Sequence, residues 1–213
     1  IWALTVALSN HVTLLLPITE IYFQQNVITQ VASIILMDGI ILLSVIAFFL
    51  ELSTKKNVNL FNFIKNLFLN PFILSIIIGL LFLLLNFNID QTPIEYTLSK
   101  LAACVSPVGL FAIGITLSFY TKNVINKLSV SISVLKLVIS PIILLLIGLV
   151  FFNAGLPAEI PGAFFVSVAP CGVTSIVLCA AYNVSPENII KAIFVSTIAS
   201  IGTIFFAIKY LTL

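Results

Sequence analysis

The stretch VSVAPCGVTSIVLCAAYN, residues 166–183, is an apolar run that Pro-Cys-Gly interrupts near its start. A proline cannot donate a backbone hydrogen bond and clashes with the preceding turn, and a neighbouring glycine loosens a helix further. We therefore expect the helix to unwind between Ala169 and Gly172. Lipid cannot satisfy the freed polar groups, so such a break is tolerated only where it is packed in protein or lines a cavity. The break thus indicates a binding site.

The composition is that of an integral membrane protein. Hydrophobic residues make up 61% and charged residues 8% of the chain, against roughly 45–50% and about 25% in soluble domains. The apolar runs have the length of membrane-spanning helices and lack the alternation of barrel strands. We therefore predict an all-α integral membrane fold. The net charge of +2 is too weak and scattered to predict nucleic-acid binding.

Three cysteines lie inside apolar runs: Cys104, Cys171 and Cys179. They form no CxxC pair and have no histidine nearby, so neither a disulfide nor a metal site is predicted. We expect no cofactor beyond a coupling proton or sodium ion.

The chain divides into about seven predicted spans. Residues 1–50 hold a broken span (2–23) and a whole span (27–50). A polar loop with an interfacial helix follows at 51–70, and residues 71–213 hold five more spans, with the second broken span at 161–183. The lysines of the loop place it in the cytoplasm of a multi-pass protein of the cell (inner) membrane.

The order of these spans suggests two repeats. A broken span followed directly by a whole one occurs at both ends of the chain. If each pair closes a repeat of five spans, the two repeats are inserted upside down, because five is odd. We therefore expect the chain to be the C-terminal part of a ten-span (5+5) inverted-repeat transporter that lacks its first three spans.

Further residues recur in a characteristic order: Ser9, Asn10 and Pro17; Asp38; Asn70 and Pro71; Pro107, Leu110, Gly114 and Leu117; Leu135, Lys136 and Pro141; Ala169, Pro170 and Ala180 to Tyr182; Ser196, Thr197 and Ser200. Their order and spacing resemble the auxin efflux carrier family, which includes bacterial carriers of small dicarboxylates. The resemblance implies ten spans whose fourth and ninth helices are broken and cross at mid-membrane, similar to bile acid sodium symporters. It places the two breaks at Asn10 to Pro17 and at Ala169 to Gly172. The residues between Asn10 and Pro17 depart from the family, which has small residues and glycine there.

Two crossing half-helices would point positive dipole ends at a shared site, which suits a carboxylate. The candidate substrate-binding residues are Asn10, Pro17, Pro170, Cys171, Gly172, Thr174 and Ser175. The alternative is that Pro170 only kinks a packed helix.

Three ionisable residues are candidates for ion coupling. Asp38 lies near the middle of its span, where an ionisable group usually marks function, although it could be protonated and bonded to a carbonyl. His11, the only histidine, could relay protons or be a packed polar group. Lys136 could contact the anion or Asp38, or extend to the membrane interface.

The sequence therefore predicts a secondary transporter, not an enzyme, for a small organic anion: a dicarboxylate such as malate or malonate, or an auxin-like acid. Its expected partners are the lipid bilayer, this anion and a second copy in a homodimer, with no nucleic acid. Three alternatives stay open: a bile acid/sodium symporter-like carrier, an intramembrane enzyme and a non-functional truncated remnant. An enzyme would need a clustered acid, base or metal constellation at membrane depth.

Overall fold

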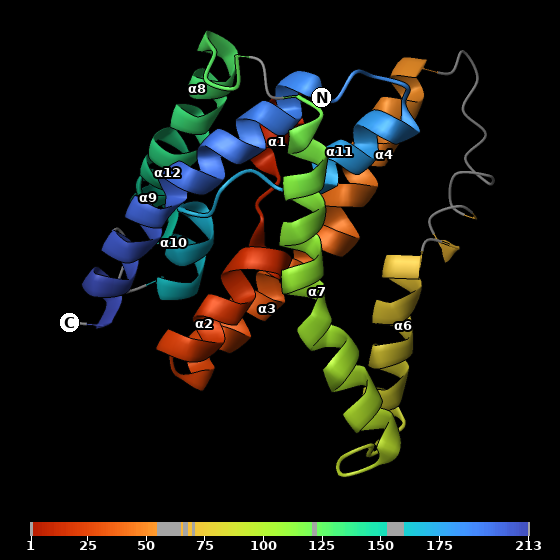
Figure 1. The fold of residues 1–213 in the computed structure, drawn as a ribbon. Coiled ribbons are helices and arrows are strands. Elements are labelled where there is room, and N and C mark those ends of the chain that lie inside the picture. The colour runs from red at the N-terminus through yellow and green to blue at the C-terminus, as the bar shows by residue number, and fades with distance from the viewer. Residues whose placement is uncertain are drawn as a thin grey trace. The chain divides into compact units, whose positions relative to one another are not determined.

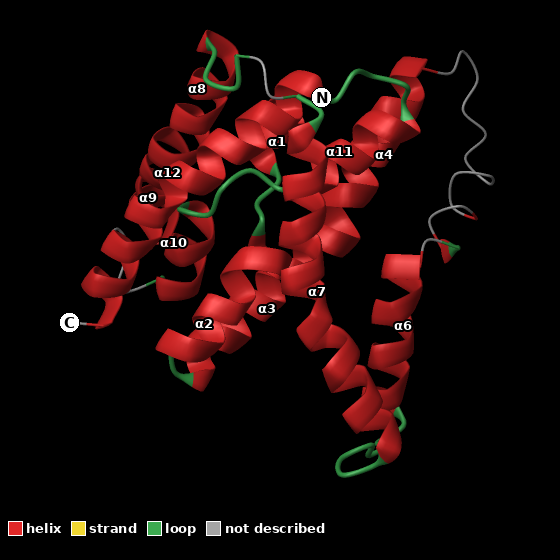
Figure 2. Cartoon of the chain, in the orientation of Figure 1, coloured by secondary structure: helices red, strands yellow, loops and turns green. Residues whose placement is uncertain are grey.

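The computed structural model describes residues 2–54, 65, 68–69, 71–120, 123–152 and 160–212. Its elements there are helices, joined by turns and by one isolated β-bridge (Figures 1 and 2). The chain forms two compact units. The first unit contains Ile1–Ala32 and Cys104–Leu213, and the second contains Ser33–Ala103.

The first broken span opens the first unit. Helix α1, Trp2–Ala7, is followed by three residues outside any helix, and the chain then enters the π-helical turn η1, His11–Leu15. Helix α2, Leu16–Tyr22, continues directly from η1, and α3, Gln25–Met37, follows. The span is therefore broken once, between Ala7 and His11.

The prediction that this break extends to Pro17 is wrong. Pro17 is the second residue of α2, and the helical run from η1 through α2 is continuous around it. In a regular helix the amide at this position would bond to the carbonyl of Thr13, and proline has no such amide. The Ser106 hydroxyl, from α7, Pro93–Ser118, donates to that carbonyl instead, at 2.6 Å. A hydroxyl on a neighbouring helix thus replaces the missing bond and lets the helix continue in lipid.

The second broken span contains the predicted break. Helix α10, Pro161–Ser167, ends one residue before Val168, and α11, Thr174–Ala181, begins one residue after Val173. The expected unwinding at residues 169–172 is confirmed and extends slightly further on both sides.

The two breaks meet in an antiparallel β-bridge between Ser9 and Cys171. The Asn10 amide donates to the Pro170 carbonyl at 2.9 Å, and the Gly172 amide donates to the Leu8 carbonyl at 2.8 Å. The chain runs in opposite directions through the two breaks, as two upside-down repeats would require. We call this meeting of residues 8–10 with residues 168–173 the crossing.

Four further helical elements lie in the first unit, besides the end of α7. A nearly continuous run contains α8, Lys127–Val134, the π turn η3, Leu135–Ile139, and α9, Ser140–Phe152. Helix α12, Glu187–Thr212, packs along α8.

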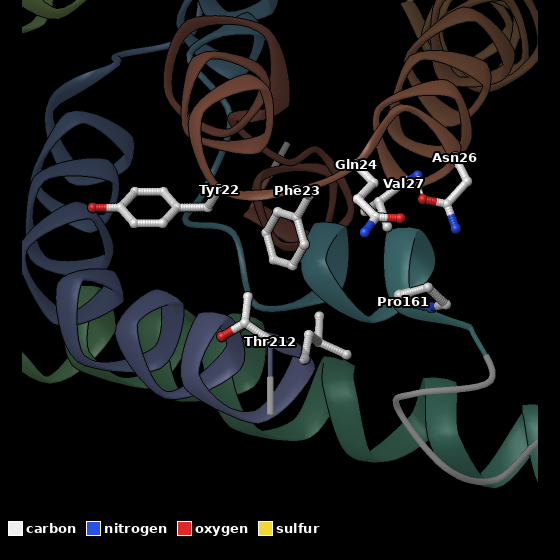
Figure 3. Close-up of a pocket in the computed structure, with 8 residues that line it drawn as sticks. Tyr22, Phe23, Gln24, Asn26, Val27, Pro161 and Thr212 are labelled. Carbon is white, nitrogen blue, oxygen red and sulfur yellow. Dashed lines mark hydrogen bonds between the residues drawn. The ribbon is translucent and has the colours of Figure 1, made fainter.

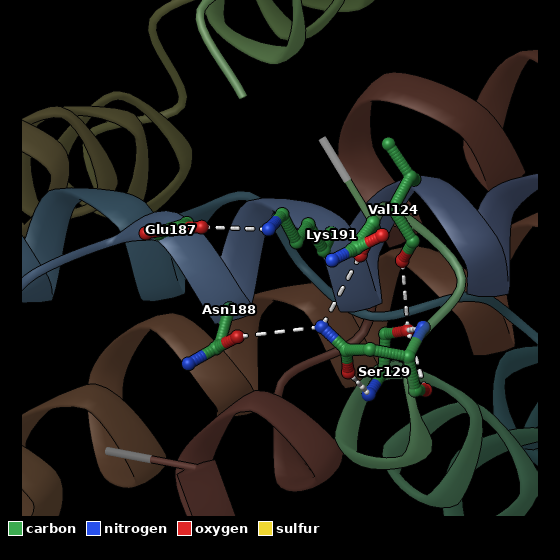
Figure 4. A network of polar contacts seen from close by, with 7 residues as sticks. Val124, Ser129, Glu187, Asn188 and Lys191 are labelled. Carbon is green, nitrogen blue, oxygen red and sulfur yellow. Dashed lines mark hydrogen bonds and ion pairs between the residues drawn. The ribbon is translucent and has the colours of Figure 1, made fainter. Parts of the chain in front are cut away.

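The starts of α8 and α12 are held together by polar side chains (Figure 4). Asn126 and Ser129 form a reciprocal capping box at the start of α8, which satisfies two amides that the helix leaves unpaired. Asn126 Nδ2 also donates to the side-chain oxygen Oδ1 of Asn188 at 3.5 Å, and Lys191 pairs with Glu187 at 2.6 Å. These contacts join the starts of two helices that pack along each other.

The second unit contains the end of α3, the π turn η2, Asp38–Leu42, and α4, Leu43–Thr54. Helix α6, Pro71–Leu84, and the first part of α7, Pro93–Ser118, follow. The predicted whole span at 27–50 is thus one helical run interrupted by a π turn. The predicted interfacial helix within 51–70 falls largely outside the described residues.

Four described helical segments are long and apolar enough to cross a membrane: Gln25–Ile46, Pro93–Ser118, Lys127–Phe151 and Glu187–Thr212. The shorter Ile73–Leu84 is also apolar. The predicted order of a broken span followed by a whole one is present at both ends of the chain. The count of about seven spans and the inverted repeat stay predictions.

We expect Gly172→Ala to destabilise the protein. A Cβ atom at Gly172 would lie 2.9 Å from the backbone oxygen of Ser9 and 3.1 Å from its carbonyl carbon, and the bridge prevents this backbone from moving away. A cost of about 1–3 kcal/mol lowers the melting temperature by roughly 2–12 °C in a chain of this size. Thermal unfolding in detergent measures the effect. Gly202→Ala, where nothing lies within 4 Å, is the control and should not lower the melting temperature.

Candidate functional site

The unwound backbone at the crossing finds partners inside the protein. Besides the two hydrogen bonds between the breaks, the Cys171 amide donates to the Ser196 hydroxyl at 3.2 Å, and the Thr203 hydroxyl donates to the Val168 carbonyl at 3.1 Å. Both hydroxyls come from α12. Since unpaired backbone groups are costly in hydrocarbon, these bonds allow two non-helical segments to lie buried against each other.

Two buried side-chain atoms beside the crossing have no hydrogen-bond partner among the described residues: Asn10 Nδ2 and Ser175 Oγ. Asn10 is 2% exposed, and its Oδ1 accepts a hydrogen bond from the Thr13 hydroxyl. Ser175 is fully buried in the first turn of α11. A buried polar atom without a partner costs about 1–3 kcal/mol, so each such atom calls for an explanation. A ligand that accepts hydrogen bonds would supply one.

A helical segment begins directly after each break. The π turn η1 begins at His11, next to Asn10, and α11 begins at Thr174, two residues after Gly172. The N-terminal end of a helix carries a positive partial charge. At the start of α11 the Ser175 amide donates to the Gly172 carbonyl at 3.3 Å and the Ile176 amide donates to the Val173 carbonyl at 2.9 Å. The Ser175 hydroxyl, which has no partner among the described residues, lies in the same turn.

Lys136 reaches the crossing from η3. It is 2% exposed, and its Nζ donates to Ser9 Oγ at 2.6 Å. The alternative in which its side chain extends to the membrane interface is therefore wrong. The lysine instead brings an amine to the residue that pairs with Cys171 in the β-bridge.

All three candidate coupling residues lie in five-residue π turns. His11 opens η1, Asp38 opens η2 and Lys136 is the second residue of η3. His11 and Asp38 are half-buried. Short π-helical turns occur frequently at functional sites, so this placement favours a role for all three residues.

The predicted substrate-binding residues separate into two groups. Asn10, Pro170, Cys171 and Gly172 meet at the crossing, and Thr174 and Ser175 begin the half-helix that leaves it. Pro17 lies further along the chain, within a continuous helical run. Asp38, a candidate coupling residue, belongs to the second unit.

A family model described as "Membrane transport protein" matches residues 1–208. The chain belongs to this family, the auxin efflux carriers. No curated protein and no solved structure matches it. Membership makes the protein a multi-pass membrane transporter that works in a lipid bilayer.

Three serines of this carrier escaped the sequence analysis as site residues: Ser9, Ser106 and Ser196. The Ser106 and Ser196 hydroxyls bond to the backbone of Thr13 and Cys171, and the Ser9 hydroxyl accepts from the Lys136 amine. Hydroxyls are common in membrane helices, so nothing local marks these three as partners of groups far away in the sequence.

A cavity of about 490 Å³ lies apart from the crossing in the same unit of the carrier (Figure 3). It is bounded by the turn between α2 and α3, the start of α10 and the last turn of α12. Its lining residues are Tyr22, Phe23, Gln24, Asn26, Val27, Pro161, Leu211 and Thr212. The predicted site residues are not among them, so the cavity and the crossing are separate features.

The described residues contain no group of three or more His, Cys, Asp or Glu side chains that could hold a metal ion. The three cysteines are free thiols, with Cys171 and Cys179 buried and Cys104 exposed. The polar groups at the crossing are instead an amide, hydroxyls and an amine, which suit hydrogen bonding to an anion.

We expect Ser9→Cys to form a disulfide with Cys171. The two residues form the pair of the antiparallel bridge that exchanges no hydrogen bonds directly. Such pairs have their Cα atoms about 4.5 Å apart with both side chains on one face, within the range that a disulfide spans. Oxidation followed by mass spectrometry of peptides, with Cys104 and Cys179 replaced by serine, measures the bond.

The matched control for this cross-link is Thr5→Cys in the same background. Thr5 lies in α1, about one turn before the break, and does not pair with Cys171 in the bridge. The control should stay reduced. Equal cross-linking from both positions, or none from position 9, would contradict the crossing.

Proposed function

We propose that this carrier is a secondary transporter of a small organic anion, either a dicarboxylate such as malate or malonate or an auxin-like acid. The anion binds at the crossing, between the two half-helices. The observation that supports this proposal best is the pair of buried polar atoms without partners, Asn10 Nδ2 and Ser175 Oγ. Asn10 lies in the first break and Ser175 in the first turn after the second break, and a carboxylate would be an acceptor for either atom.

The electrostatics of the crossing favour an anion over a neutral solute. The start of α11 contributes the positive partial charge of a helix N-terminus, and Lys136 contributes a buried amine. Hydrogen bonds from neutral donors to a charged group contribute about 1.5–3 kcal/mol each. Asn10 and Ser175 together would therefore account for much of the affinity of a small acid.

Movement of the anion follows from the position of the site. A solute held where two helices are interrupted can be exposed to either side when one helical bundle moves against the other. The sequence has no nucleotide-binding fingerprint, so an ion or solute gradient drives the movement. His11 or Asp38 exchanges the coupling proton or sodium ion.

Uptake into proteoliposomes tests the proposal. The full-length protein is reconstituted, and radiolabelled malonate, malate and indole-3-acetate are offered in separate assays. We expect uptake of at least one acid. An excess of an unlabelled acid of the same class, dicarboxylate or auxin-like, should reduce that uptake. If none of the acids is transported or bound, the proposed substrate class is wrong.

Ser175→Ala and Asn10→Ala should affect transport and stability differently. Ser175→Ala removes an atom without a partner among the described residues, so its melting temperature should stay within about 2 °C of the wild-type value or rise. Asn10→Ala also removes the Oδ1 acceptor of the buried Thr13 hydroxyl, so its melting temperature should fall. Each also removes a donor to the anion, which should weaken anion binding about 10- to 100-fold. Uptake and thermal unfolding are measured on the same preparations.

Ser118→Ala serves as the control for this pair. The Ser118 hydroxyl bonds to the carbonyl of Ile115 within its own helix and is exposed. Its removal should change neither uptake nor melting temperature. Unchanged uptake in both Asn10→Ala and Ser175→Ala would remove the crossing as the binding site.

A further inference from the structure

We propose that the Lys136 ammonium is the built-in cation of the crossing and occupies the position where a free sodium ion would otherwise bind. The inference rests on the proposed function for its meaning in transport. It selects between the two coupling ions that the proposed function leaves open.

The carbonyl ends of two half-helices lie beside the crossing. A helix ends with unpaired carbonyls and a negative partial charge. In transporters with broken helices, these ends and the unwound carbonyls beside them are where coupling cations bind. Here α1 ends at Ala7 and α10 ends at Ser167, each within two residues of the crossing.

The Lys136 amine lies next to one of these carbonyl ends, at Ser9. Its Nζ lies 2.6 Å from Ser9 Oγ, and Ser9 is only two residues beyond the end of α1. The hydroxyl and carbonyl oxygens of such a segment are the ligands that a small hard cation would need. The amine already takes this hydroxyl, and the 2% exposure of Lys136 leaves its position closed to solvent.

The Lys136 ammonium would repel a second cation bound beside it. Two positive charges about 4 Å apart repel each other by about 4 kcal/mol near a protein surface and by more in a drier site. A sodium ion at Ser9 would therefore have to displace the ammonium or overcome this repulsion. The tethered charge also provides a counter-charge for an anion at the crossing without a second solute.

The consequence is that sodium does not bind at the crossing and does not drive transport. Of the two coupling ions, the proton is left, exchanged at His11 or Asp38. The charge of Lys136 stays with the protein through the cycle, whereas a bound sodium ion would be released with the substrate.

Thermal unfolding of the purified full-length protein tests this inference without any transport. Wild-type melting temperatures in equal concentrations of sodium chloride and potassium chloride should agree within about 1 °C, because a site that is already filled gains no ligand stabilisation. Lys136→Ala vacates the position. It should melt at a lower temperature in potassium than the wild type, and sodium should restore part of the loss.

Lys136→Met is the matched control, because it keeps most of the stem while removing the charge. It should also be destabilised, but sodium should not rescue it, since the side chain still fills the space. A sodium-specific rise in the wild-type melting temperature overturns the inference. Equal behaviour of Lys136→Ala and Lys136→Met in both salts overturns it too, because the lysine would then only fill space. If Lys136→Ala does not fold, the wild-type comparison decides.

Uptake distinguishes this inference from the proposed function. If an organic anion enters proteoliposomes but its rate falls more than fivefold when sodium is replaced by choline, the inference fails and the proposed function stands. If no anion enters under any condition, the proposed function fails, and the melting temperatures still decide the cation assignment. Equal uptake in sodium and choline supports both.

Discussion

The structure depends on one constraint, the need of every backbone amide and carbonyl in hydrocarbon to find a partner inside the protein. A single interrupted helix would leave such groups unpaired. Here the breaks pair with each other, through the amides of Asn10 and Gly172 and the carbonyls of Pro170 and Leu8. Each break therefore stabilises the other, and neither is expected to persist alone. At the crossing, the two broken helices thus satisfy backbone groups of one another.

Hydroxyl groups on neighbouring helices form hydrogen bonds with further backbone groups of the broken spans. Ser196 and Thr203 of α12 pair with the second break, and Ser106 of α7 pairs with the carbonyl that Pro17 leaves without an amide. These bonds hold the crossing rigidly enough for two side chains beside it, Asn10 and Ser175, to keep polar atoms unpaired. A site that binds and releases a solute needs this combination, because donors already paired within the protein would not gain from binding.

The ionisable side chains at and beside the crossing come from π turns. Lys136 reaches it from a π turn, and His11 begins another π turn directly after the first break. A π turn widens a helix locally, so a side chain there is displaced from the position that regular helical spacing assigns to it. In this auxin efflux carrier the three candidate coupling residues thus lie in π turns, while the crossing itself is formed by non-helical backbone.

Local rules determined much of this protein from sequence alone. The apolar runs specified a helical membrane fold, and Pro-Cys-Gly specified where the second break begins, because both effects act within a few residues. The same local rule failed at Pro17. The Ser106 hydroxyl, which bonds to the Thr13 carbonyl in place of the missing proline amide, is 93 residues away in the sequence. Ser9 and Lys136, 127 residues apart, could not be paired from sequence either. Only the tertiary structure decides which break ends where and what a buried lysine contacts, because these outcomes depend on groups that the folded chain alone brings together.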